Sequence, residues 1–173
     1  MRIHHASPFA VVLAVFLLTA ACSGREEPIV HPSPTGSAVA GCRAVMAGLP
    51  QTVAGARLKD HDATVATWGD PRIVLRCGVN KPAGLQPTSR CDVINDVGWF
   101  SEQIDNGWRF TTIGRMGNVE VTVPTSYVPQ ADALVDLSAA VKKMPKCARV
   151  SEIACQGYVP ISAGRGAFPE LTQ

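Results

Sequence analysis

The sequence predicts an α+β fold: an antiparallel sheet of roughly four strands, with an N-terminal and a C-terminal helix packed on one face and disulfide stabilisation. Two observations favour this class. Apolar residues with helical spacing occur towards both ends of the predicted domain, and short segments with alternating apolar residues lie between them. Helices that flank a run of strands cover one face of an antiparallel sheet. The 15 glycines and 13 prolines indicate short elements joined by many turns.

The first predicted helix spans residues 37–49. Ser37 is the expected N-cap, and Pro50 ends the helix because proline cannot continue helical hydrogen bonding. The apolar stripe of this helix consists of Val39, Cys42, Val45, Met46 and Leu49.

Residues 72–79 form the first clear strand. Its apolar residues alternate and share one face: Ile73, Leu75, Cys77 and Val79. Before it, residues 51–62 show weak alternation and residues 63–68 follow. The Gly-Asp-Pro sequence at 69–71 predicts a chain reversal, because proline biases the preceding residue away from helical angles.

A β-hairpin is predicted in the middle of the chain. Two strands, residues 97–104 and 108–114, join around Asp-Asn-Gly at 105–107, where Asn-Gly tolerates the positive φ angles of a tight turn. Residues 119–123 add a half-buried strand whose valines alternate with polar residues. Residues 80–92 are expected to form a loop.

The second predicted helix spans residues 130–144, and Pro145 ends it. Its apolar stripe consists of Leu134, Leu137, Val141 and Met144. Residues 37–145 therefore form a single α+β domain, and residues 146–173 form a loop-rich, cysteine-containing tail.

The chain begins with a predicted export signal. Arg2 and two histidines precede an apolar run at residues 8–18, and small residues lead up to Cys22. This arrangement resembles the lipobox of bacterial lipoproteins, so residues 1–21 are a predicted lipoprotein signal peptide and Cys22 is the predicted lipidation site. The run is shorter than the roughly 20 apolar residues of a spanning helix. An ordinary secretory peptide and an uncleaved anchor are the alternatives.

Residues 22–36 form a predicted proline-rich tether that reaches at most about 40 Å. It is expected to hold the domain at the outer face of the cytoplasmic membrane. Through the lipid anchor, this membrane is the first expected partner. The 16 lysines and arginines nearly balance the 14 aspartates and glutamates, and they form no basic run. A nucleic-acid partner is therefore not expected.

Disulfides are the expected state of cysteines in an exported protein. Cys42 lies on the helical stripe and Cys77 on the apolar face of the first clear strand, so packing the helix on that face brings the sulfurs together. Cys147 and Cys155 are a second candidate pair. Cys91 is left over and is expected to be a buried small side chain, with a reactive or intermolecular thiol as the alternative. The absence of Cys-x-x-Cys argues against a zinc site.

Several short motifs together resemble one protein family. They are Cys-Arg at 42–43, Leu-Pro at 49–50, Trp-Gly-Asp-Pro at 68–71, Val-Leu-Arg-Cys-Gly-Val at 74–79, Phe-Thr-Thr-x-Gly-Arg at 110–115 and Val-Glu-Val-x-Val-Pro at 119–124. Over about residues 40–143 this combination is similar to the actinobacterial domain-of-unknown-function family 3515. The resemblance implies an exported or membrane-associated protein, supports the Cys42–Cys77 pair and implies no activity. Cys91 and the cysteines of the tail depart from its commoner pattern.

The predicted domain lacks a recognisable catalytic set. Its only histidine is His61, in polar, loop-like surroundings, so a Ser-His-Asp or Cys-His arrangement would depend on this residue. Dinucleotide, phosphate-loop and zinc-protease motifs are absent, and no cofactor or metal is expected. A carboxylate pair for sugar hydrolysis stays open, its candidates being Asp70, Asp96, Glu102, Asp105 and Glu120.

Arg76, Arg115 and Trp68 are the candidate ligand-binding residues. A guanidinium group binds a carboxylate or phosphate through two hydrogen bonds, and a tryptophan lines a ligand groove or the edge of a core. The alternative for the arginines is an internal ion pair, Arg115 with Glu120 or Arg76 with Asp70.

Together these features predict a lipid-anchored, extracytoplasmic envelope protein that acts as a non-enzymatic binding or accessory module. Its expected partner, besides the membrane, is another envelope protein or a cell-wall component. The alternatives are a carboxylate-dependent hydrolase acting on cell-wall glycans and a structural domain without a ligand. A deep cavity with two convergent carboxylates favours the enzyme, whereas an apolar groove favours the binding module.

Overall fold

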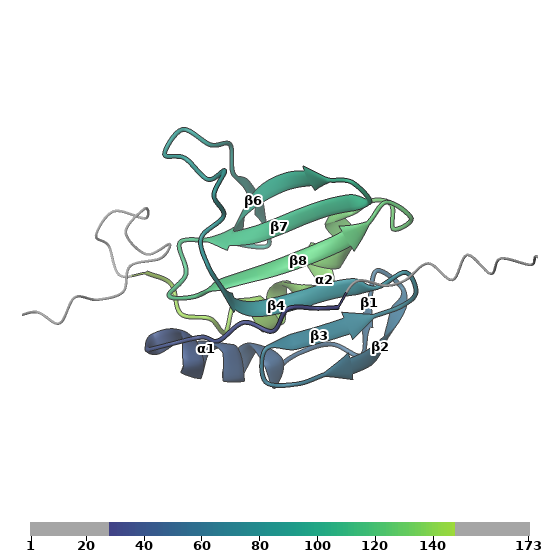
Figure 1. Ribbon diagram of the computed structural model, residues 1–173, viewed down its shortest axis with the longest axis horizontal. Coiled ribbons are helices and arrows are strands. Elements are labelled where there is room, and N and C mark those ends of the chain that lie inside the picture. Colours follow the sequence, from purple (N-terminus) through teal and green to yellow (C-terminus); the bar gives the residue numbers. More distant parts are fainter. Residues whose placement is uncertain (1–27, 148–173) are drawn as a thin grey trace, which may run out of the picture.

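An eight-stranded antiparallel sheet and two helices make up the part of the chain that the computed structural model describes, residues 28–147 (Figure 1). The strand order is β1-β2-β3-β4-β8-β7-β6-β5. The helices are α1 (Ser37–Met46) and α2 (Ala131–Val141), and the strands are β1 (Thr52–Val53), β2 (Ala56–His61), β3 (Val65–Trp68), β4 (Ile73–Val79), β5 (Asp92–Ile94), β6 (Val97–Ile104), β7 (Gly107–Ile113) and β8 (Asn118–Pro124).

The prediction of roughly four strands is wrong, because the described residues contain eight. Strands β4, β6, β7 and β8 coincide with the segments whose apolar residues alternate. The others carry little periodic signal: β1 and β5 have two and three residues, β2 is mostly exposed, and β3 is buried along its whole length. Clear alternation arises only where one face of a strand is buried and the other is not.

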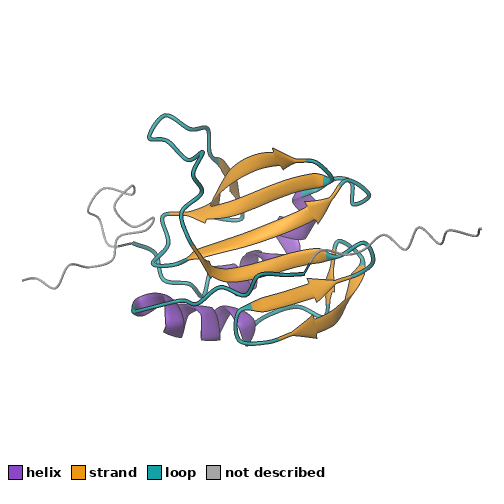
Figure 2. Cartoon of the chain, in the orientation of Figure 1, coloured by secondary structure: helices purple, strands orange, loops and turns teal. Residues whose placement is uncertain are grey.

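The helices and the N-terminal residues lie on opposite faces of the sheet. α1 contacts β4, and α2 contacts β1, β5 and β8. Residues 28–36 run across the other face, in front of the sheet in the view of Figures 1 and 2. These residues belong to the segment that the sequence assigns to the tether, so part of that segment lies against the domain.

The hydrophobic core lies between the helices and the sheet. Residues Ile73, Leu75 and Cys77 of β4 are buried in it, as predicted, while the intervening residues are only partly buried. The predicted stripe of the second helix is also confirmed, because its four members are buried: Leu134, Leu137, Val141 and Met144. Burying each such side chain contributes roughly 1.5–3 kcal/mol.

The first helix is shorter than predicted and begins differently. Its N-cap is Gly36, and no side chain caps its first turn, so the expected Ser37 cap is wrong. The helix ends at Met46 rather than at residue 49. Val39 is 41% exposed, which narrows the buried stripe to the side that carries Cys42.

Two tight hairpins position the strands β5, β6 and β7. The predicted β6–β7 hairpin is confirmed: Ile104 pairs with Gly107 across a two-residue turn. A side chain at Gly107 would collide with the backbone of Val123, so glycine is needed there for close packing. The positive φ expected of Asn106 and Gly107 is not observed. The β5–β6 turn consists of Asn95 and Asp96, both with positive φ, which matches the twist of a hairpin.

A disulfide joins the helical layer to the middle of the sheet. Cys42 of α1 and Cys77 of β4 are bonded across 35 residues of sequence, as predicted, and both are buried. Cys147 is also disulfide-bonded, but its predicted partner Cys155 lies outside the described residues, so that pairing stays a prediction. The predicted signal peptide and Cys22 lie outside them too.

We expect Cys42→Ser and Cys77→Ser each to lower the melting temperature by about 10 °C, and the double variant to lower it no further. The reason is that either change opens the same 35-residue loop, whose closure is worth about 3–4 kcal/mol. Differential scanning calorimetry measures the effect, with Cys91→Ser as the matched control because that thiol is exposed and unbonded. Additive losses in the double variant would contradict the expectation.

Candidate functional site

A groove opens between the β5–β6–β7 end of the sheet and the start of α2, on the helical side. We call it the α2 groove. Its cavity has a volume of about 310 Å³. It is lined by Asp92, Ile94, Ser101, Trp108, Phe110, Gln130, Ala131 and Leu134.

Two aromatic rings form one wall of the α2 groove. Trp108 and Phe110 are two positions apart on β7, so their side chains point to the same face of the sheet. Their ring centroids are 6.3 Å apart with an interplanar angle of 19°, a stacked arrangement. Phe110 and Leu134 belong to the core, whereas Trp108 is partly buried and reaches the groove surface.

A carboxylate stands at the edge of this apolar wall. Ser101 Oγ donates a hydrogen bond to Asp92 Oδ2 at 3.2 Å, and Arg90 Nε donates one to Oδ1 at 3.3 Å. The Asp92 side chain is still 43% exposed and accessible from the groove. The Arg90 side chain is 90% exposed and is not among the residues that line the groove.

The short strand β5 is what positions the carboxylate. The Asn95–Asp96 turn brings β5 back along β6, so that Asp92 pairs with Trp99 and reaches Ser101. Sequence reasoning missed this site because it assigned residues 80–92 to a loop. Two sequence features could have indicated the site: the Asn95-Asp96 pair, which forms the two-residue turn, and the alternating aromatic residues Trp108 and Phe110 of β7.

A second cavity, the outer cavity, lies on the opposite face of the sheet beneath the N-terminal residues. Its volume is about 370 Å³, and seven of its nine lining residues are polar or charged. The lining residues are Ile29, His31, Lys59, Asp60, His61, Asp62, Val65, Thr67 and Arg72. His61, the only histidine that the sequence offered to a catalytic arrangement, is exposed here.

Asp62 is held as an anion in the outer cavity. Its Oδ1 accepts hydrogen bonds from the backbone N–H groups of Thr64 and Val65 at 2.7 and 2.8 Å, and its Oδ2 lies 2.8 Å from His31 Nδ1. The Thr64 bond above all lowers the pKa of Asp62. Burial opposes it, but the Val65 bond and the nearby His31 lower the pKa further, so the net shift is downward. A general acid for glycoside hydrolysis needs a raised pKa, so Asp62 does not suit that role.

The structure does not bring the three predicted ligand-binding residues together. Arg76 lies on the outer face, where its Nε and Nη2 donate to Glu120 Oε1 at 2.9 and 2.7 Å, and its Nη1 donates to the Val30 carbonyl at 3.3 Å. Its partner is thus Glu120 rather than the Asp70 that the sequence suggested. The Arg76 guanidinium tethers the N-terminal residues to the sheet.

Arg115 is buried and donates hydrogen bonds to carbonyls just after the end of α2. Only 3% of it is exposed, and its Nη1 donates to the carbonyls of Met144 at 2.8 Å and Lys142 at 3.3 Å, while Nη2 donates to the carbonyl of Asp96 at 3.4 Å. Burial lowers the pKa of Arg115. The suggested ion pair with Glu120 is replaced by these carbonyl contacts.

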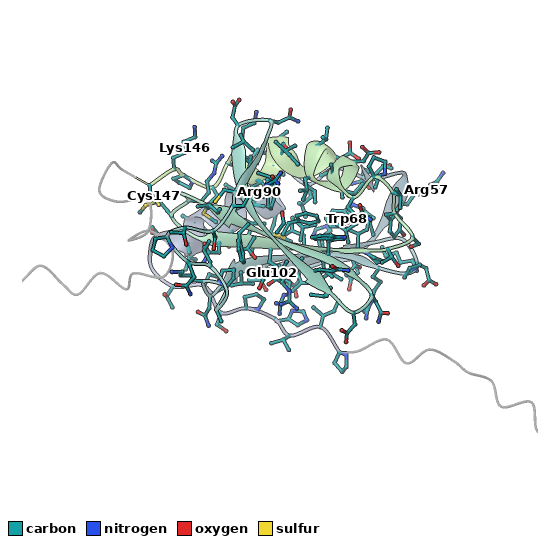
Figure 3. All side chains as sticks on the ribbon, turned by 90° about the horizontal axis from the view of Figure 1, so that it is seen from above. Arg57, Trp68, Arg90, Glu102, Lys146 and Cys147 are labelled. Atoms are coloured by element: carbon teal, nitrogen blue, oxygen red, sulfur yellow. A yellow bond between two sulfur atoms is a disulfide. The ribbon has the colours of Figure 1, made fainter. Side chains whose placement is uncertain are left out.

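Trp68 is a core residue. It is fully buried, and its Nε1 donates to the Pro50 carbonyl at 3.1 Å. Figure 3 shows it in the interior, well away from Lys146 and Cys147 at one end of the molecule. Cys91 is exposed, so the expectation of a buried thiol is wrong.

The five carboxylates considered for hydrolysis do not line the α2 groove, where Asp92 is the only acidic residue among the lining residues. Within residues 28–147 no cluster of histidine, cysteine or carboxylate side chains is arranged to hold a metal ion. The same residues contain no helix of the length and hydrophobicity that crossing a membrane requires.

Comparison with known families identifies the chain. Residues 6–148 match the family model described as "Protein of unknown function (DUF3515)". The chain belongs to the DUF3515 family. No match was found among curated proteins or among solved structures. Membership of DUF3515 confirms the resemblance seen in the sequence motifs, and it assigns no activity.

We expect Arg115→Ala to lower the free energy of unfolding by about 3 kcal/mol, because it removes charge-assisted hydrogen bonds from buried carbonyls. Arg115→Lys should recover only part of the loss, since a single ammonium group cannot reach both Met144 and Asp96 in the same way. Urea denaturation followed by circular dichroism measures both variants. Unchanged stability would show that the guanidinium is not structural and would revive its role in ligand binding.

Proposed function

We propose that this chain is a non-enzymatic binding module of the cell envelope, anchored to the outer face of the cytoplasmic membrane by a lipid on Cys22. The observation that supports the binding role is the α2 groove. Aromatic and aliphatic walls converge there with a few placed polar groups, which is the composition of sites that take a small ligand or one side chain of a partner.

The groove supports binding rather than hydrolysis. Retaining and inverting glycosidases use two carboxyl groups about 5–10 Å apart. The α2 groove offers the single carboxylate of Asp92 among its lining residues. A binding site needs no second carboxylate, so the groove is sufficient for recognition.

The sequence before the domain supports the anchor. The small residues that precede Cys22 follow an apolar run of export-signal length. Only residues 23–27 separate Cys22 from Pro28, where the described domain begins. A stretch of that length spans at most about 20 Å, so an anchored domain would lie close to the membrane surface.

We expect Cys22→Ala to release the protein from the membrane fraction and to remove a lipid adduct from its N-terminal peptide, because the thiol is the proposed attachment point. Fractionation of expressing cells and mass spectrometry of the purified chain measure the two effects. Cys91→Ala is the matched control and should change neither. Membrane retention of the Cys22→Ala protein without any adduct on the wild type would contradict the anchor.

We expect a photoreactive amino acid at Gln130 to form a discrete covalent adduct in living cells, because this residue lines the groove. The same amino acid at Val135, which is exposed elsewhere on α2, should not form it. The yield of the adduct should fall when Trp108→Leu removes the partly exposed ring of the aromatic wall. Adducts of equal yield from Gln130 and Val135, or none from Gln130, would contradict the binding role of the groove.

A further inference from the structure

The charge of the α2 groove restricts what it can bind. Asp92 is the only ionisable side chain among its lining residues, and the neighbouring first turn of α2 carries another acid, Asp132. The base paired with Asp92 is Arg90, whose side chain is 90% exposed and does not line the groove. Asp132 offsets the partial positive charge of the α2 N-terminus, so the carboxylate of Asp92 is left to complement a positive charge.

The Asp92 carboxylate is prepared to accept a donor. Ser101 Oγ donates to Oδ2 at 3.2 Å, and Oδ1 accepts from Arg90 Nε at 3.3 Å with Arg90 Nη2 also 3.3 Å away, so every contact to this carboxylate is long. An exposed arginine held by long contacts to a single oxygen contributes little stability in water, and a competing cation can replace it. Arg90 thus occupies a place that the cation of a ligand can take.

The aromatic wall favours the same chemistry. The face of an indole ring carries negative electrostatic potential and attracts an ammonium or guanidinium group. Trp108 is the partly exposed ring of the wall, and beyond it the apolar side chains of Ile94 and Leu134 suit an aliphatic stem. A carboxylate, an indole face and an apolar wall in one cavity of about 310 Å³ match a cation at the end of a hydrocarbon chain.

We propose that the α2 groove binds the side chain of a lysine-like residue of a partner, with the ammonium group on Asp92 and the methylene stem along Trp108 and Ile94. This inference deepens the proposed binding function and rests on it. The ammonium displaces Arg90 from Asp92 Oδ1, and the contact with Ser101 stays in place. Recognition is by charge and stem together, so neither an apolar side chain nor a neutral sugar is an adequate substitute.

The test uses the full chain and three probes in NMR titrations. They are Nα-acetyl-lysine N-methylamide, its uncharged counterpart Nα-acetyl-norleucine N-methylamide, and the disaccharide of N-acetylglucosamine. We expect the lysine probe to bind at least about tenfold more tightly than the norleucine probe, because it adds one charge-assisted hydrogen bond. The disaccharide should be the weakest.

Three variants locate the effect. Asp92→Asn should lower the affinity for the lysine probe about tenfold and leave the affinity for the norleucine probe unchanged. The substitution keeps the shape of the side chain and an oxygen that accepts from Ser101. Arg90→Ala should increase the affinity for the lysine probe two- to threefold, which is on the order of the energy of an exposed ion pair. Asp105→Asn makes the same charge change in the exposed β6–β7 turn and should have no effect.

The outcomes separate this inference from the proposed function. Equal binding of lysine and norleucine probes, or no effect of Asp92→Asn, overturns the cation inference and leaves an apolar binding groove. Tighter binding of the disaccharide overturns it in favour of a glycan. If no probe binds, the inference fails, and the cross-linking from Gln130 decides separately whether the groove binds anything. A change in melting temperature identifies any variant whose loss of binding comes from unfolding.

Discussion

The Cys42–Cys77 disulfide is the constraint on which the rest of the domain depends. It joins α1 to β4, a strand in the middle of the sheet order, so the first helix cannot leave the core without breaking a covalent bond. On the other side of β4 the ladder continues into β8 and then into the β7–β6–β5 meander that forms the α2 groove. The second helix completes the layer, and Arg115 holds its C-terminal carbonyls against the β5–β6 turn. Helix, sheet and groove are therefore parts of one cross-linked unit rather than separate modules.

The features that could be predicted are those with a strong local cause. The alternation around Cys77 identified β4 and, with the helical stripe around Cys42, the disulfide. The Asp-Asn-Gly sequence at 105–107 marked the position of the β6–β7 hairpin, although the turn itself is Asp105-Asn106 and has no positive φ. The features that were missed have weak local signals or depend on partners distant in sequence. β5 has three residues and β1 has two, and such lengths carry no measurable period.

In the candidate site, too, the contacts that could not be predicted are those between residues distant in sequence. The residues next to Arg115 in the sequence do not indicate that its guanidinium donates to backbone carbonyls about thirty residues later. Arg76 pairs with Glu120 because the register of β4 and β8 places the two residues opposite each other. Asp92 and Ser101 meet only because a two-residue turn folds β5 back on β6. An arginine or a carboxylate is easy to recognise as polar from sequence, but whether it serves the fold or a ligand is decided by contacts that only the folded chain contains.

The course of residues 28–36 has a steric consequence. They cross the face of the sheet opposite to the helices, where Arg76 holds the Val30 carbonyl and Asp62 holds His31. The groove opens on the helical face, from side chains such as Trp108 and Leu134. A bulky occupant of the groove therefore leaves the N-terminal crossing untouched, with the full thickness of the sheet between them. The domain can therefore be held through the residues upstream of 28 and bind an occupant in the groove at the same time, because the two contacts use opposite faces of the sheet.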